Sequence, residues 1–206
     1  MTGVFEYWPN RITALRFVGA LGLFFVLAQW GEPRADMPPA EYALAMDVAF
    51  WLFLAVALSD ILDGWLARRG KHITAFGRIA DPFVDKVLVL GAMVYLTVLP
   101  WSRHLFPAWV VVVILAREFL VTGIRGYVES LGHEFPADWF GKIKMLVQCW
   151  AVGIPLGLEA FEFSTLAEER WEFVAHGCVI ATVATSVGSG FTYVLKARKL
   201  LASPNA

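Results

Sequence analysis

Charge is scarce in this chain of 206 residues, since Asp, Glu, Lys and Arg make up 17% of it and hydrophobic residues 58%. A soluble domain of this length needs more charge to cover its surface. The mean hydropathy of +0.61 instead places the chain among membrane proteins. The formal net charge of -1 identifies no partner by itself, so the position of each charge carries the information. We expect the lipid bilayer as a partner and no nucleic acid.

Cysteine and histidine are also rare, with two and four residues. Cys149 and Cys178 both lie in apolar stretches and fit no metal-ligand spacing, and the histidines lie outside any recognisable ligand pattern. This excludes a disulfide framework and a zinc site, and it predicts that both cysteines pack in the interior.

Long apolar segments are what the chain has in abundance. Crossing a bilayer takes roughly 20 helical residues, and segments of about this length lie at 11–30, 42–68, 77–100, 107–128, 140–158 and 172–195. Breakers or charges separate them, and no linker is long enough to mark a second domain. The sequence predicts an all-α integral membrane protein with six transmembrane helices, and a single domain over residues 1–206.

The basic residues predict the orientation. Six spans place both termini on one side, where thirteen basic residues fall, against three on the other. The first group is Arg11, Arg16, Arg68, Arg69, Lys71, Arg78, Lys86, Arg125, Lys142, Lys144, Lys196, Arg198 and Lys199; the second is Arg34, Arg103 and Arg170. Both termini are therefore expected to be cytoplasmic.

Four aspartates at membrane depth form the most informative pattern. Asp60 and Asp63 end the second segment, and Asp81 and Asp85 begin the third. Spacings of three and four place each pair on one helical face, and the short connection makes the two helices neighbours. Carboxylates gathered in a low-dielectric site must be neutralised, and oxygen ligands in this number suit Mg²⁺ or Mn²⁺. The pattern favours two divalent cations, the alternative being solvated or salt-bridged anchors at helix ends.

Small and basic residues beside the aspartates indicate phosphate chemistry. Gly64 and Ala67 leave room next to them, Arg68 is suited to pairing with a phosphate, and Gly77 allows close approach of the third helix.

These residues also match a known signature, D-x-x-D-G-x-x-A-R, eight residues, then G-x-x-x-D-x-x-x-D, from Asp60 to Asp85. The chain thereby resembles the CDP-alcohol phosphatidyltransferase family. The segments around Asn10, Thr13 and Arg16, then 116–125 and 140–144, are similar to the branch that makes phosphatidylglycerophosphate.

The resemblance implies a six-helix fold, commonly a homodimer, with a polar cavity at the cytoplasmic end of helices 2 and 3. It implies that the four aspartates bind two divalent cations and that Asp85 is the base that takes the proton of the acceptor hydroxyl. It also implies a set of residues for the CDP-linked lipid. These are Gly64, Arg68, Thr74, Gly77, Asn10 and Thr13.

Cations near the predicted cavity suggest the acceptor. Arg117 lies well inside the fourth segment, Arg125 two turns nearer the cytoplasm, and Lys142 and Lys144 begin the fifth. Buried cations in a membrane are costly and usually functional, so this group favours a phosphate-bearing acceptor such as glycerol 3-phosphate. Arg117 could instead pair with adjacent Glu118 or with a neighbouring helix, and the two lysines could be membrane anchors.

The leading hypothesis is a phosphatidyltransferase, located in a bacterial plasma membrane with its site facing the cytoplasm, that uses CDP-diacylglycerol and glycerol 3-phosphate. The nearest alternative keeps the chemistry and changes the acceptor to inositol phosphate, serine, or phosphatidylglycerol in cardiolipin synthesis. A channel or transporter whose aspartates carry cations is a third possibility. No relay of ionisable residues continues across the membrane, which counts against conduction.

Overall fold

Six helices make up the part of the protein that the structure describes. The computed structural model describes residues 8–70, 75–132 and 139–201, with the side chains of residues 8–9, 60–70, 75–79, 81–82, 139–142 and 201 outside the description. The helices are α1 (Trp8–Trp30), α2 (Pro39–Gly70), α3 (Ala75–Val98), α4 (Ala108–Ser130), α5 (Trp139–Ala160) and α6 (Thr165–Leu201). No strand occurs in the described ranges.

Each helix covers one of the six apolar segments that the sequence predicts. The largest difference is at α6, which begins at Thr165 and ends at Leu201, outside the predicted 172–195. Its added turns are polar, with Glu168 near the start and Arg198 and Lys199 near the end. Acidic side chains at a helix N-terminus and basic ones at the C-terminus stabilise the helix dipole, so the helix continues beyond its apolar part.

Within the described residues, four helices contain stretches long and apolar enough to cross a membrane, namely α1, α2, α5 and α6. The all-helical membrane class is thus confirmed. In α3 and α4 every 18-residue window carries more than two charged residues, among them Asp85, Lys86, Arg117 and Glu118. Asp85 and Arg117 are among the residues that the sequence predicts to line a site, which explains why charge occurs inside these two helices.

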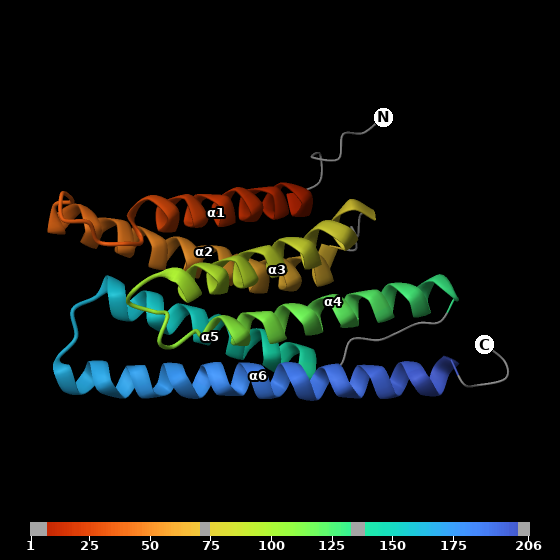
Figure 1. Ribbon diagram of the computed structural model, residues 1–206. Helices are drawn as coiled ribbons and strands as arrows, with labels where there is room; N and C mark the ends of the chain where they lie inside the picture. The colour runs from red at the N-terminus through yellow and green to blue at the C-terminus, as the bar shows by residue number, and fades with distance from the viewer. Residues whose placement is uncertain (1–7, 71–74, 133–138, 202–206) are drawn as a thin grey trace.

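The helices run alternately up and down a bundle (Figure 1). Helix α1 begins and α6 ends at the same end of it, which is called the terminal end below; α2 also ends there and α3 begins there. Helix α1 packs on α2 and α3, α2 on α5, and α6 on α4 and α5. This packing brings residues that are far apart in the sequence close together in the half of the bundle nearer the terminal end.

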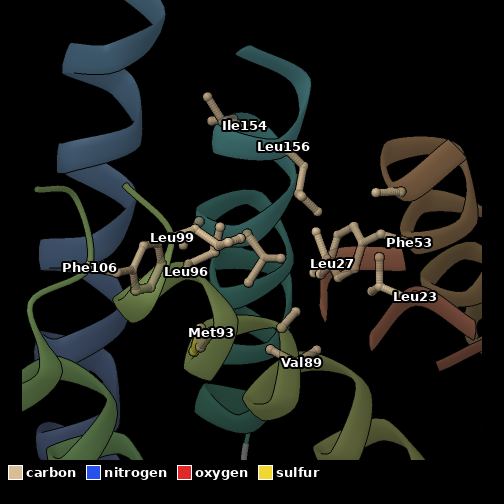
Figure 2. Packing of buried hydrophobic residues seen from close by; sticks show 14 of the residues in the cluster. Leu23, Leu27, Phe53, Val89, Met93, Leu96, Leu99, Phe106, Ile154 and Leu156 are labelled. Carbon is tan, nitrogen blue, oxygen red and sulfur yellow. The ribbon is translucent and has the colours of Figure 1, made fainter. Parts of the chain in front are cut away.

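Apolar side chains from several helices fill the interior (Figure 2). Leu23 and Leu27 of α1, Phe53 of α2, and Met93 and Leu96 of α3 are all at most 2% exposed. Many large apolar side chains remain exposed on the outside, Phe119, Phe173 and Leu166 each by more than 70%. An apolar outer surface of this kind suits a protein whose solvent is lipid.

The other end of the bundle is tied together by side chains in its connections. Trp30 Nε1 donates a hydrogen bond to Glu41 Oε1 at 2.7 Å, and Trp101 Nε1 donates to the carbonyl of Gly31 at 2.9 Å. His104 Nε2 lies 2.5 Å from Glu172 Oε1, which joins the α3–α4 connection to α6. These contacts fix the end of the bundle that carries few basic residues.

Candidate functional site

The aspartate signature lies at the terminal end, on two adjacent helices. Asp60, Asp63, Gly64 and Arg68 belong to the last part of α2, and Gly77 and Asp81 to the start of α3. Their side chains, together with those of Thr74 and Lys142, lie outside the described residues. Because α2 and α3 contact each other, the two aspartate pairs are on neighbouring helices as expected. The roles of these residues stay predictions.

Asp85 is the one signature aspartate whose side chain is described, and it has a cationic partner. Arg16 Nη2 of α1 donates a hydrogen bond to Asp85 Oδ1, and the pair forms an ion pair. The Arg16 side chain is 3% exposed and that of Asp85 20% exposed. Charge-assisted hydrogen bonds of this kind are strong in a low-dielectric interior, so Arg16 fixes the direction in which the Asp85 carboxylate points.

Helix α1 presents further polar residues next to Arg16. Asn10 is 1% and Thr13 3% exposed. Asn10, Thr13 and Arg16 follow one another at intervals of three residues, which places them along one side of the helix. Burial of polar groups in a membrane helix is costly unless they have partners. The side of α1 that faces the interior is therefore polar in its terminal half, while contact of Asn10 and Thr13 with a lipid donor stays a prediction.

Among the described side chains, three cations from α3, α4 and α5 pair with one carboxylate, that of Glu118. Arg117 Nη1 donates to Glu118 Oε1 at 2.9 Å, and Lys144 Nζ of α5 donates to the same oxygen. Lys86 Nζ of α3 lies 3.7 Å from Glu118 Oε2 and donates to Thr122 Oγ1 at 2.6 Å. With Arg125 these residues form what is called the cationic cluster below, defined as Lys86, Arg117, Arg125, Lys144 and Glu118. A single carboxylate leaves the cationic cluster with a net positive charge.

Helix α6 holds the two arginines of the cationic cluster. Arg117 Nη2 donates to Ser189 Oγ at 2.7 Å, and Arg125 Nη2 donates to Tyr193 Oη at 2.9 Å. Arg117 is 9% exposed, and Ser189 and Tyr193 2% and 3%. Buried cations need partners of this kind to be tolerated, and the contacts explain how α4 carries two arginines inside the bundle.

Two neighbouring residues of α3 connect the acidic and basic parts of the site. Asp85 is paired with Arg16 of α1, and Lys86, the next residue, with Thr122 and Glu118 of α4. Successive side chains on a helix diverge by roughly 100°, so α3 directs a carboxylate and an ammonium to two sides at one depth. The arrangement places the cationic cluster next to the helix that carries the predicted base.

The structure decides one alternative that the sequence left open. Lys144 is 8% exposed and paired with Glu118, so it is no surface anchor. Arg117 pairs with Glu118 and also with Ser189 of α6, which are the two kinds of partner that the simpler interpretation gave it. Its contact with an acceptor phosphate stays a prediction.

Sequence reasoning missed the parts that Lys86, Ser189 and Tyr193 play. Two signals were available in the sequence. Lys86 directly follows a signature aspartate, and Ser189 and Tyr193 are polar residues four positions apart within the apolar part of α6.

The donor set fits the hard divalent cations expected from the sequence. Asp85 is an oxygen donor on α3, and the other three aspartates belong to α3 and to the adjacent α2. Among the side chains that are described, no three His, Cys, Asp or Glu residues gather closely enough to hold a metal ion. The side chains of Asp60, Asp63 and Asp81 lie outside the described residues. The four-aspartate ligand set therefore stays a prediction, supported by the preference of divalent cations for oxygen ligands.

The fold and the site define an all-helical membrane protein with a partly buried cationic cluster beside a carboxylate-bearing helix. The sequence profile of a family described as CDP-alcohol phosphatidyltransferase matches residues 6–187. The chain belongs to this family, and it is therefore a transferase of phospholipid metabolism.

Three relatives illustrate the similarity. A Bacillus subtilis protein named CDP-diacylglycerol--glycerol-3-phosphate 3-phosphatidyltransferase is 34% identical over 172 residues, which are 77% of this chain and 84% of the relative. A Mycobacterium tuberculosis protein named "Probable phosphatidylglycerophosphate synthase" is 39% identical over 148 residues, 70% of this chain and 63% of the relative. A Streptomyces coelicolor protein named "Cardiolipin synthase (CMP-forming)" is 30% identical over 201 residues, 94% of this chain and 83% of the relative.

Proposed function

We propose that this protein transfers the phosphatidyl group of CDP-diacylglycerol to glycerol 3-phosphate, giving phosphatidylglycerophosphate and CMP. The observation that carries the proposal is the net positive cationic cluster next to Asp85, in which Arg117, Glu118 and Lys144 are buried. An acceptor that bears a phosphate as well as a hydroxyl matches a site with cations on one side and a carboxylate on the other. The names of relatives that use glycerol 3-phosphate support the same acceptor.

The chemistry requires one proton transfer and one displacement at phosphorus. The acceptor hydroxyl oxygen bonds to the phosphorus that carries the diacylglycerol, the bond from that phosphorus to the CMP oxygen breaks, and its electron pair leaves with CMP. Asp85 is the group that takes the hydroxyl proton. Arg16 holds the Asp85 carboxylate in position, and Arg117 and Arg125 orient the acceptor through its phosphate. Two divalent cations, Mg²⁺ or Mn²⁺, held by Asp60, Asp63, Asp81 and Asp85, would supply positive charge that offsets the pyrophosphate.

The proposed orientation places the terminal end of the bundle, and with it the active site, at the cytoplasmic face of a bacterial plasma membrane. The excess of basic residues at that end supports it. A water-soluble acceptor and the cytidine would then enter from the cytoplasm, while the lipid tails stay in the bilayer. The homodimer that the family resemblance implies stays a prediction, and sedimentation of the protein in detergent checks it.

An apolar groove between α2 and α5 is proposed to take an acyl chain of the donor. Its volume is about 680 Å³, and its wall is formed by residues such as Ala57 and Leu58 of α2 and Leu146 and Cys149 of α5. Leu58 lies two residues before the signature begins at Asp60. From there the groove continues to Phe161 and Trp171 near the other end of the bundle. A tail attached to a headgroup at the signature therefore has an apolar path along α2.

Filling this groove should discriminate between donors by chain length. Leu146→Trp adds bulk to the wall of the groove. We expect it to lower kcat/KM for a long-chain CDP-diacylglycerol by about threefold to tenfold more than for a short-chain donor, since that difference corresponds to the apolar burial of about one or two methylene groups. The matched control is Leu21→Trp, an exposed position on α1 outside the groove. Equal effects on both donors would refute the assignment of the groove.

A second acceptor has support from one observation. The cardiolipin synthase of Streptomyces coelicolor aligns with 94% of this chain, and phosphatidylglycerol also carries a phosphate. Within the cationic cluster, Arg125 lies near the end of α4 and Lys144 near the start of α5, both toward the terminal end of the bundle, from which a small water-soluble phosphate monoester would enter. A second negative charge on the acceptor suits a cluster with several cations, which favours glycerol 3-phosphate over phosphatidylglycerol.

The test is CMP release by the purified protein in detergent with CDP-diacylglycerol and Mg²⁺ or Mn²⁺. We expect release with glycerol 3-phosphate and none above background with serine, inositol, inositol phosphate or phosphatidylglycerol. Chelation of the divalent cations should abolish the release, and returning Mg²⁺ or Mn²⁺ should restore it. Release with phosphatidylglycerol alone would replace the proposed acceptor, and cation flux without CMP release would replace the proposed class of activity.

A further inference from the structure

Helix α6 carries a line of polar residues that the proposed function does not use directly. Thr182, Ser186, Ser189 and Tyr193 follow one another at spacings of four, three and four, and none is more than 3% exposed. These spacings place them on one face of the helix. Hydroxyl groups buried in a membrane helix are unfavourable without partners, so this face is expected to have a function in the interior.

Only the half of this line nearer the terminal end contacts the cationic cluster. Ser189 accepts a hydrogen bond from Arg117, and Tyr193 accepts one from Arg125. The Tyr193 ring centroid also lies 5.8 Å from Arg117 Cζ and 5.7 Å from Arg125 Cζ. These distances are within the range of cation–π attraction. One aromatic ring thus contacts both guanidinium groups.

Close packing of α4 against α6 makes this contact possible. The two helices lie side by side in the bundle (Figure 1). A Cβ atom at Gly190 would lie 3.1 Å from Arg117 Cγ, which is tighter than most carbon contacts. Glycine at this position therefore lets the stem of Arg117 lie against the α6 backbone while its head reaches Ser189.

The arginines keep hydrogen-bonding capacity after these contacts. Arg117 uses Nη1 for Glu118 and Nη2 for Ser189, and Arg125 uses Nη2 for Tyr193. Within the described part of the chain, the buried Nε atoms of both arginines have no hydrogen-bond partner. Unpartnered donors of a buried cation indicate an anionic ligand, since leaving them unpaired is costly.

We propose that Tyr193 and Ser189 are positioning residues of α6 that hold Arg125 and Arg117 in the orientation that binds the acceptor phosphate. The proposal rests on the proposed function. Long arginine side chains lose conformational freedom when they bind a ligand, and contacts that fix them beforehand raise affinity. Removing such contacts should weaken acceptor binding and leave donor binding unchanged.

The experiment compares KM for glycerol 3-phosphate with KM for CDP-diacylglycerol in the full-length protein. We expect Ser189→Ala and Tyr193→Leu each to raise KM for glycerol 3-phosphate by roughly tenfold, as the loss of a hydrogen bond to a charged group or of a cation–π contact predicts. Tyr193→Phe keeps the ring and should give a smaller increase. KM for CDP-diacylglycerol should change by less than about twofold in all three variants, because no donor contact is removed.

The matched control is Ser186→Ala, one turn away on the same face of α6. Ser186 is as buried as Ser189, and its hydroxyl has no hydrogen-bond partner among the described residues. We expect its KM values to equal those of the wild type. Melting temperatures of all variants separate an effect on the site from an effect on folding.

Three kinds of result would overturn the proposal. Unchanged KM for glycerol 3-phosphate in Ser189→Ala and Tyr193→Leu would refute the positioning role while the proposed function stands. Equal increases in both KM values, or an equal increase in Ser186→Ala, would make the role one of general helix packing and would refute it too. Wild-type protein that releases CMP only with an acceptor lacking phosphate would overturn the proposed function and this inference together. If another phosphate-bearing acceptor is used, the same comparison of KM values for that acceptor decides.

Discussion

Asp85→Asn is expected to lower kcat for CMP release by about 10²-fold to 10⁴-fold, the usual contribution of a general base. Asparagine has nearly the same size as aspartate, and its side-chain oxygen still accepts the hydrogen bond from Arg16 that orients residue 85. It does not accept a proton from a hydroxyl group near neutral pH. The fold should therefore be kept while proton removal is lost, and steady-state kinetics at saturating concentrations of both substrates measures the effect.

The chain offers a matched control for this substitution. Asp47 is also a half-buried aspartate in a helix, but it lies thirteen residues before Asp60 on α2, which corresponds to about 20 Å along the helix. We expect Asp47→Asn to change kcat by less than about twofold, within the usual range for a substitution remote from the chemistry. Asp85→Asn protein that keeps more than a tenth of the wild-type rate would contradict the role as base. Recovery of the rate at higher Mg²⁺ would instead limit Asp85 to metal binding.

Arg117→Gln is expected to raise KM for glycerol 3-phosphate by about 10-fold to 100-fold, since a hydrogen bond to a charged group contributes roughly 1.5–3 kcal/mol. Arg117 is the most deeply placed cation on α4 in the cationic cluster, and its buried Nε has no partner among the described residues. Glutamine keeps a polar head of smaller size but has no charge to offer a phosphate. KM for CDP-diacylglycerol should stay within about twofold, because the donor's phosphates are assigned to the signature residues.

The substitution also breaks a buried ion pair, and its effect on stability must be measured beside the kinetics. Removing one member of such a pair can cost about 3–5 kcal/mol because the other charge stays buried. Lys144 still pairs with Glu118, so we expect a smaller loss here. The double variant Arg117→Gln with Glu118→Gln also removes the carboxylate that pairs with Lys144, so we expect its melting temperature to fall below that of Arg117→Gln, while KM for glycerol 3-phosphate stays raised.

A charge control comes from the other end of the bundle. Arg103 is exposed in the α3–α4 connection, and Arg103→Gln makes the same change in charge away from the site. Its KM values should match those of the wild type. If Arg117→Gln and Arg103→Gln have equal effects on KM for glycerol 3-phosphate, the cationic cluster does not bind the acceptor phosphate.

Much of this protein was determined by the sequence alone. Apolar segments of membrane-spanning length predicted the six helices, because in lipid the backbone must satisfy its hydrogen bonds within each segment. The spacing of Asp60, Asp63, Asp81 and Asp85 identified the family, since these residues lie close together in sequence and their spacing fixes which side of a helix they share. The cations at positions 117, 125 and 144 were also identifiable, because charge is rare in apolar segments.

The tertiary structure decided which residues meet. Helical periodicity gives the face on which a side chain lies but does not say which neighbouring helix that face contacts. The partners that matter are distant in sequence. Arg16 pairs with Asp85, and Arg117 with Ser189, 69 and 72 residues apart along the chain. The packing of α1 on α3 and of α4 on α6 created these contacts, so the roles of Arg16, Ser189 and Tyr193 became visible only once the helices were assembled.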